Sequence, residues 1–276
     1  HDPVTKPLVL QLGGNEPDLL AQAGKKAAEA GFNGINLNVG CPSARVGKGG
    51  FGAWMMHDPA RVHDCMHALA EAGLPVSVKC RIGITGRQTF DELLQFIDRV
   101  SAVGACRSFY IHARIAVLGG LSPKQNRTIP PLRHDQVFRL KAARSDLWIA
   151  LNGGITRLDD LPDLLQHCDG VMIGRAAYRD PMMLAGADQM MGFGKDYPLA
   201  GARPEDQRLM VAQGLDQLCR QMFQPGMSRW PLIRHLGGLY YHAAGARRFR
   251  RSLGEYAACP NPDPHWFEAQ ASRLVT

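Results

Sequence analysis

Short apolar segments recur along the first two thirds of the chain, and each ends at glycine, proline or a polar residue. Their length, their β-branched and apolar content and these flanking residues are typical of buried β-strands. The pattern predicts strands over residues 8–12, 34–39, 76–80, 108–112, 148–152 and 170–173.

Between these strands, apolar residues follow a helical spacing. The helix over 17–30 begins at a proline after Asn15 and Glu16 and ends at Gly31, and glycines also end the next two helices. The full set of predicted helices is 17–30, 59–72, 90–103, 134–144 and 158–167. Strands that alternate with helices predict a parallel α/β sheet or a (β/α)8 barrel.

Beyond about residue 194 the strand pattern stops. Helical patterns over 205–221, 230–243 and 264–274 follow, separated by proline and glycine turns. The sequence therefore predicts a barrel domain over residues 1–193 and a small helical domain over residues 194–276.

The composition limits the classes of protein. At 276 residues and 45% hydrophobic content, the chain can bury a substantial core. Its seven cysteines are an odd number without CxxC spacing, which favours a reducing compartment and argues against a disulfide framework or zinc site. No apolar run reaches the length of a membrane span. The start, His-Asp-Pro, has no signal pattern and no initiating Met, so we expect a fragment or a processed product.

The net charge of +7 is concentrated in two stretches. Residues 107–144 contain eight Lys or Arg against the single acid Asp135, and residues 232–254 contain five Arg and no acid. Clustered positive charge attracts a polyanion, because phosphate neutralisation releases counterions. The alternative is a solvated basic face without a partner.

Cys41 follows the strand predicted over 34–39 and precedes Pro42 and a glycine-rich basic loop. This order places the thiol at the C-terminal end of a strand, where parallel α/β barrels carry their active groups. The alternative is a small buried hydrophobe. Pro42 and the glycines favour the loop position.

The Gly-Cys-Pro-Ser motif and the Gly-Gly-Phe-Gly-Ala that follows it resemble the signature of tRNA-dihydrouridine synthases, most closely the A-type branch. The likeness continues in family order through Gln11-Leu12-Gly13-Gly14, Val78-Lys79-Cys80-Arg81-Ile82-Gly83, Ile111-His112-Ala113-Arg114, Leu121-Ser122-Pro123-Lys124, Ile129-Pro130-Pro131-Leu132, Leu151-Asn152-Gly153-Gly154-Ile155 and Val171-Met172-Ile173-Gly174-Arg175. In that family two further strands precede the Gln-Leu-Gly-Gly strand. We therefore expect a (β/α)8 barrel that lacks its first two strands here, with lower stability than a full-length relative.

The resemblance implies reduction of the C5–C6 bond of a D-loop uridine in tRNA, with hydride from reduced FMN and NADPH as the transient reductant. Cys41 is the implied proton donor, since a thiol of ordinary pKa is mostly protonated at neutral pH. The implied flavin contacts are Gln11, Lys79 and His112. The implied phosphate site comprises Asn152, Gly153, Gly154, Gly174 and Arg175.

Implied RNA contacts come from both domains. Asn38 would face the target base, and the catalytic rim would contribute Arg45, Lys48, Arg114, Ser122, Lys124 and Arg127. Arg247 and Arg250 would come from the helical domain, where Phe249 interleaves with arginines in a pattern that suits stacking beside phosphate contacts. Cys80 departs from the histidine expected at that position of the family pattern.

Two alternatives remain open. One is a flavin-dependent barrel reductase of a free pyrimidine or another enone-like molecule, and the other is an inactive tRNA-binding fragment. In each case we expect a monomer without metal or membrane contact. The expected location is the cytoplasm, or an organelle if a transit peptide was lost.

Overall fold

A computed structural model describes residues 7–102, 104, 106–192, 202–224 and 227–274. Contacts divide the chain into two compact units. The sheet unit contains His1–Ile155 and Asp160–Met172, and the helical unit contains Thr156–Asp159 and Ile173–Thr276. The boundary predicted between residues 193 and 194 lies outside the described residues, so the functional division at that point stays a prediction.

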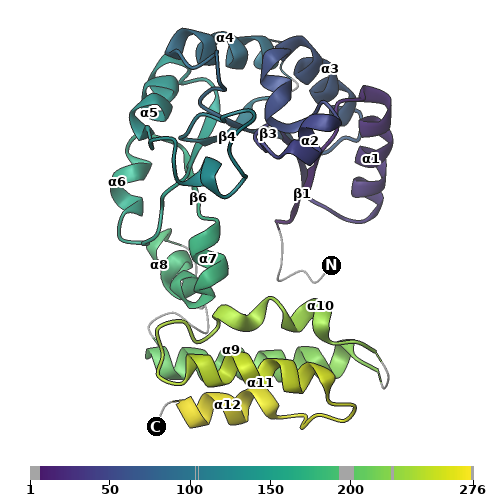
Figure 1. Ribbon diagram of the computed structural model, residues 1–276, viewed down its shortest axis with the longest axis vertical. Helices are drawn as coiled ribbons and strands as arrows, with labels where there is room; N and C mark the ends of the chain where they lie inside the picture. The colour runs from purple at the N-terminus through teal and green to yellow at the C-terminus, as the bar shows by residue number, and fades with distance from the viewer. Residues whose placement is uncertain (1–6, 103, 105, 193–201, 225–226, 275–276) are drawn as a thin grey trace. The chain divides into compact units, whose positions relative to one another are not determined.

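The sheet unit contains six strands, all parallel and paired in chain order. They are β1 (Val9–Leu12), β2 (Gly34–Asn38), β3 (Val76–Arg81), β4 (Ser108–His112), β5 (Trp148–Asn152) and β6 (Gly170–Met172). Figure 1 shows the strands surrounded by an arc of helices. The predicted α/β fold is confirmed, and every predicted strand is present with ends shifted by at most one residue.

The helices of the sheet unit include three short segments that the sequence did not predict. The elements are α1 (Pro17–Glu29), α2 (Ala44–Lys48), η2 (Gly52–His57), α3 (Pro59–Ala70), α4 (Phe90–Ser101), η3 (Gln125–Arg127), α5 (His134–Ala143) and α6 (Leu161–Leu165). Local capping sets two of the starts: Asp58 accepts from the backbone N–H of Arg61, and Thr89 forms a reciprocal capping box with Glu92. The unpredicted segments are α2 and η2, which come after Cys41 in the chain, and η3.

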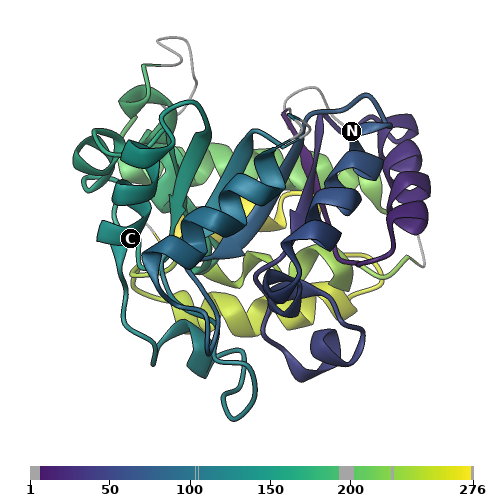
Figure 2. The same ribbon diagram turned by 90° about the horizontal axis from the view of Figure 1, so that it is seen from above.

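The two faces of the sheet differ in chemistry. Side chains alternate along each strand, so one face carries an apolar set that is buried. Figure 2 shows helices of the sheet unit over the strands. The apolar set is Ile35, Leu37, Val78, Phe109, Ile111, Ile149 and Leu151. By the same register, the other face carries Gln11, Asn36, Asn38, Ser77, Lys79, Tyr110, His112 and Asn152. This second face is polar and is called the polar face below.

The helical unit contains α7 (Arg175–Arg179), η4 (Pro181–Gly186), α8 (Ala187–Met190), α9 (Pro204–Met222), α10 (Trp230–Ile233), η5 (Leu236–Gly238), α11 (Ala246–Ala258) and α12 (Trp266–Leu274). The single helix predicted over 230–243 is wrong, because the chain there forms α10, the separate turn η5 and further turns. The sequence also missed α11, although its buried residues Phe249, Leu253 and Tyr256 have helical spacing. None of the described helices is long and apolar enough to cross a bilayer.

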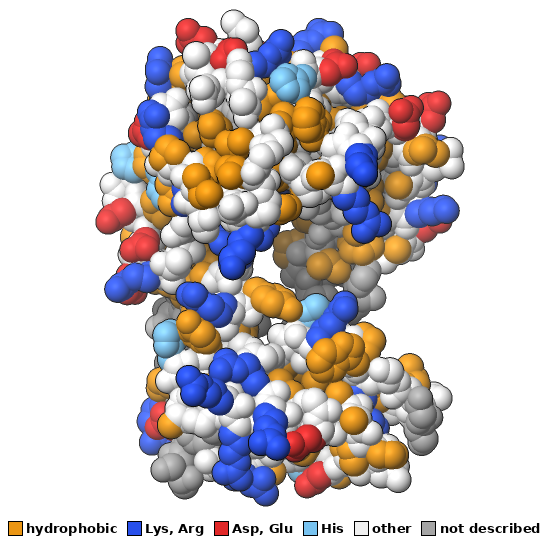
Figure 3. Space-filling view, in the orientation of Figure 1, with side chains coloured by type: hydrophobic (Ala, Val, Ile, Leu, Met, Phe, Trp, Pro, Cys, Tyr) orange, Lys and Arg blue, Asp and Glu red, His pale blue; other side chains and the backbone are white. Residues whose placement is uncertain are grey.

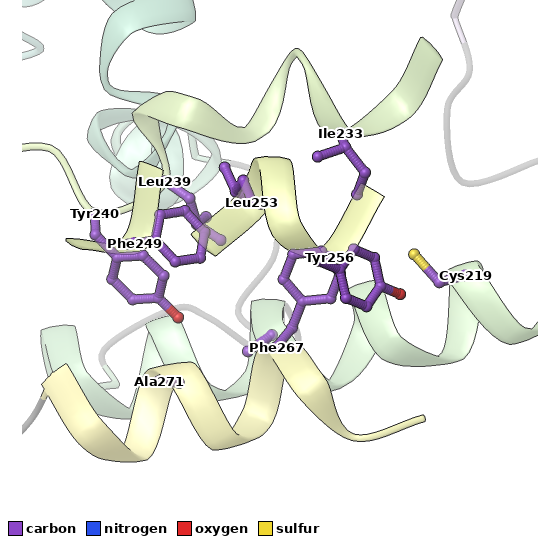
Figure 4. Packing of buried hydrophobic residues seen from close by; sticks show 10 residues of the cluster. Cys219, Ile233, Leu239, Tyr240, Phe249, Leu253, Tyr256, Phe267 and Ala271 are labelled. Carbon is purple, nitrogen blue, oxygen red and sulfur yellow. The ribbon is translucent and has the colours of Figure 1, made fainter. Parts of the chain in front are cut away.

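An aromatic core holds the helical unit together. Figure 4 shows Phe249 between Tyr240 and Leu253. Phe249 is only 1% exposed, and its ring meets that of Tyr240 edge-on at 4.5 Å between centroids. The expected role of Phe249 in stacking on RNA is therefore wrong, since α11 turns this ring inward and its arginines outward.

Candidate active site

Cys41 lies on a loop that hydrogen bonds hold at the C-terminal end of β2. The side-chain oxygen of Asn38 accepts the backbone N–H groups of Gly40 (3.0 Å) and Cys41 (3.1 Å). The Cys41 carbonyl accepts from the N–H of Ala53, and the Cys41 thiol lies 3.5 Å from the Ser43 hydroxyl. Gly52 is required here, because its φ is +67° and a Cβ would lie 2.6 Å from the Cys41 oxygen. Cys41 is partly exposed.

Arg81 connects this loop to the segment that follows β4. Its Nε donates to the Gly40 carbonyl at 3.0 Å, and one Nη donates to the carbonyls of Ile115 (2.8 Å) and Asn126 (3.0 Å). The side chain is 3% exposed, and burial lowers the pKa of Arg81 to about 10. Arg81 therefore holds the residue before Cys41 in place with hydrogen bonds rather than with an ion pair.

Lys79 lies beside Asn38 on the polar face, since the two residues are register partners in β2 and β3. Its ammonium donates to the Asn152 side-chain oxygen at 3.2 Å, and Asn152 in turn donates to the Met172 carbonyl at 2.8 Å. Burial lowers the pKa of Lys79, with the Arg81 charge acting in the same direction. Among the described residues no carboxylate pairs with Lys79. The site thus keeps a partly buried cation that an anionic ligand can approach.

His112 and the glycines after β5 pack against one another. A Cβ at Gly153 would lie 2.5 Å from His112 Cδ2, and one at Gly154 would lie 2.4 Å from Leu132 Cδ1. Both glycines have left-handed φ values, +113° and +76°. The Gly153 carbonyl also lies 2.8 Å from His134 Nε2. These glycines therefore bring the chain close to the His112 ring.

Gln11 lies on the polar face of β1, where its register partner is Asn36 of β2. It donates to the Asn36 side-chain oxygen at 2.7 Å, and Asn36 donates to the Ser77 hydroxyl at 2.9 Å. The hydroxyl of Ser77 then donates to the Ile35 carbonyl. This chain fixes the orientation of the Gln11 amide, which is exposed on the polar face.

The rim residues differ in how far their polar groups are engaged. Ser122 and Gln125 cap each other reciprocally, so the Ser122 hydroxyl accepts a backbone N–H at 3.2 Å. Arg114 donates to the carbonyls of Thr128 and Pro130 and thereby holds its own loop. The remaining predicted rim cations are exposed: Arg45, Lys48, Lys124 and Arg127.

The other predicted residues belong to the helical unit. Gly174 precedes α7 with φ −114°, a value that does not need glycine, and Arg175 is exposed at the start of that helix. Arg247 and Arg250 are exposed on α11. Figure 3 shows Lys and Arg side chains gathered over the helices at the bottom of the view. The structure thus brings together Asn38, Cys41, Lys79, His112, Asn152 and Gly153 within the sheet unit.

Sequence reasoning missed four residues of the site. Asn36 could have been found from its alternation with Asn38, and Ser43 from its place two residues after Cys41. Arg81 stood in a quoted motif, but its partners lie 34, 41 and 45 residues away. No local signal marks His134, because its contact with Gly153 depends on the tertiary fold.

Comparisons with known proteins identify the family of the chain. Residues 1–266 match the family described as dihydrouridine synthase (Dus). A Vibrio vulnificus protein named tRNA-dihydrouridine(20/20a) synthase is 44% identical over 92% of this chain and 76% of its own length. The protein of that name from Xanthomonas axonopodis pv. citri is 44% identical over 100% of this chain and 80% of its own length.

A third protein of that name, from Pseudomonas putida, is 48% identical over 92% of this chain and 73% of its own length. Among solved structures, morphinone reductase in complex with tetrahydroNAD matches with a TM-score of 0.41 and 13% identity, over 67% of this chain and 52% of that chain. A similarity this low carries no functional inference. The family match covers nearly the whole chain, and the chain belongs to the dihydrouridine synthase family.

Proposed function

We propose that this protein reduces uridine to 5,6-dihydrouridine in the D-loop of tRNA, with FMN as the bound cofactor and NADPH as the transient reductant. The single observation that carries the proposal is the partly buried Lys79, which has no carboxylate partner among the described residues and is the register partner of Asn38, before the loop of Cys41. A buried cation without a counter-ion is costly in an enzyme that binds no anion. The names of the relatives supply the substrate class.

The polar face suits an isoalloxazine ring. Gln11 is held by Asn36 and exposes an amide that both donates and accepts, as the alternating N and O atoms of the ring require. Lys79 would stabilise negative charge on the ring's pyrimidine edge, and His112 would contact the ring or the ribityl chain. Asn152, Gly153 and Gly154 at the end of β5 would approach the phosphate, with Gly174 and Arg175 as further ligands.

Reduced FMN would supply the hydride for C6 of the uracil. The negative charge that develops at C5 and the adjacent carbonyl is then quenched by a proton, which Cys41 delivers from its thiol. Ser43, at 3.5 Å from the thiol, provides a path for returning that proton from solvent. Asn38 has its side-chain oxygen engaged with backbone, so its Nδ2 is the group available to donate to a uracil carbonyl.

The basic residues of both units support tRNA as the substrate. Arg45, Lys48, Lys124 and Arg127 are exposed cations of the sheet unit, and Arg247 and Arg250 are exposed cations of α11 in the helical unit. A uridine must leave its stack to reach the site, and contacts at both units would hold the RNA while it does. A reductase of free pyrimidines would have no use for the arginines of α11.

The first experiment is the visible absorbance of the purified chain, followed by release and quantification of flavin. We expect near-stoichiometric FMN and NADPH-dependent formation of dihydrouridine in unmodified tRNA. Equal turnover of free uridine would instead support the small-molecule reductase. A colourless protein that takes up no added FMN and still binds tRNA would support the inactive binding fragment.

A further inference from the structure

Trp54 is an aromatic side chain that the proposed chemistry leaves unused. It belongs to η2, where Gly52, Ala53, Met55 and Met56 are all buried. The Trp54 indole alone among these neighbours is turned outward and is 37% exposed. An isolated exposed apolar residue needs no explanation. The contacts of this ring with α2 set it apart.

The ring lies directly against the backbone of α2 at Gly47. A Cβ built at Gly47 would lie 2.3 Å from Trp54 Nε1 and 2.8 Å from Cε2, closer than real Cβ contacts. Gly47 is not among the residues with left-handed φ, so its backbone conformation does not require glycine. The glycine makes room for the indole, and the two residues together fix the orientation of an exposed ring.

Two cations lie near Gly47 in the sequence of α2, and the residue before Trp54 is hydrogen-bonded to the loop of Cys41. Arg45 and Lys48 lie on either side of Gly47 in α2 and are both exposed. Among the described residues neither forms an ion pair. Ala53, which precedes the tryptophan, donates to the Cys41 carbonyl at 3.0 Å. Trp54 therefore follows a residue that is hydrogen-bonded to Cys41, the proposed proton donor.

We propose that Trp54 is a stacking platform for an unpaired base of the RNA substrate, with Arg45 and Lys48 contacting the adjacent phosphates. An aromatic face beside two cations is the arrangement that proteins use for single-stranded RNA, because every base has a π-face and every linkage a charge. The proposal rests on the proposed function. It adds a nucleotide contact outside the uridine pocket.

The test is the Kd of the full chain for unmodified tRNA, measured by fluorescence anisotropy over a range of salt concentrations. Trp54→Ala is expected to raise Kd about 5- to 150-fold, the effect of losing one base–aromatic stack, with an unchanged salt slope. Lys48→Ala is expected to lower the magnitude of that slope by about one. Trp54→Phe retains a π-face and is expected to stay within about threefold of the original Kd.

Two further variants separate stacking from folding. Gly47→Ala displaces the ring without removing it and is expected to raise Kd in the same direction as Trp54→Ala. Leu19→Ala removes an apolar side chain of α1 that is 63% exposed, and is expected to leave Kd unchanged. A Trp54→Ala protein that binds tRNA as tightly as the original chain overturns the inference while leaving the proposed function in place. An original chain that does not bind tRNA overturns both.

Discussion

Arginines of the two units differ in burial and in hydrogen-bond partners. In the sheet unit, Arg81 is 3% exposed and donates to the carbonyls of three backbone residues. In the helical unit, the four arginines of α11 are exposed, and their helix is fixed by Phe249 from the opposite side. The number of positive charges in a segment therefore does not identify a polyanion site. Burial and hydrogen-bond partners decide which cations position a loop and which are free to meet phosphate.

Substitution of Cys41 should affect turnover without affecting tRNA binding. Cys41→Ala is expected to lower the turnover of uridine in tRNA about 10²- to 10⁴-fold, the usual contribution of a general acid, while FMN content and the Kd for tRNA stay the same. Cys259→Ala is the matched control, because this second partly exposed cysteine lies in the helical unit. Unaltered turnover in Cys41→Ala would remove Cys41 from the mechanism.

A pair of arginine substitutions tests the contrast between burial and exposure. Arg81→Met is expected to lower the free energy of unfolding by about 3 kcal/mol, since it leaves buried carbonyl groups without donors. Arg248→Met on α11 is expected to change it by less than about 0.5 kcal/mol, because that side chain is exposed. Urea unfolding measures both. Equal losses in the two variants would contradict the positioning role of Arg81.

Local signals account for what the sequence predicted correctly. The strands were found because parallel strands covered by helices are short apolar runs, and the helices between them because proline and glycine mark their ends. Cys41 was found because its motif is local as well.

Interactions between distant residues account for what the sequence missed. The Arg run was interpreted as a binding surface together with Phe249, because the pattern of charges obscured the helical spacing of the buried residues in α11. The orientation of Phe249 depends on Tyr240 and Trp266, which lie outside the helix. Short elements such as α2 and η2 have too few residues to show a period, although they position Trp54 and the cations beside it.

The exposed arginines of α11 should affect binding without affecting stability. Arg247→Ala combined with Arg250→Ala is expected to weaken tRNA binding about tenfold at moderate salt and to lower the magnitude of the salt slope by about two. Arg203→Ala is the control, because Arg203 is exposed in the same unit but paired with Glu205 and Asp206. An unchanged salt slope would show that α11 makes no phosphate contact. The exposed arginines of the helical unit would then have no role in RNA binding.

Substitution of Lys79 is expected to have the smallest effect, and the sign of the change in stability is informative. Burial lowers the pKa of Lys79 in the folded chain below its ordinary value of 10.5. Between the lowered pKa and 10.5, the unfolded chain therefore binds more protons than the folded chain does. The stability of the original chain therefore rises with pH across that window, and below it the buried charge is a constant cost. Lys79→Met removes the charge and is expected to make the FMN-free protein about 1 kcal/mol more stable at pH 7. The difference should shrink as the pH approaches 10.5, as thermal unfolding at several pH values would show.

With FMN bound the order is expected to reverse, because Lys79 then has an anionic partner that stabilises its charge. A variant that is less stable at neutral pH without FMN would mean that Lys79 is held by the fold rather than kept for a ligand. A gain in stability that persists with FMN would mean that the cofactor does not use it. Only the predicted reversal connects the cost of this buried cation to the binding of an anion.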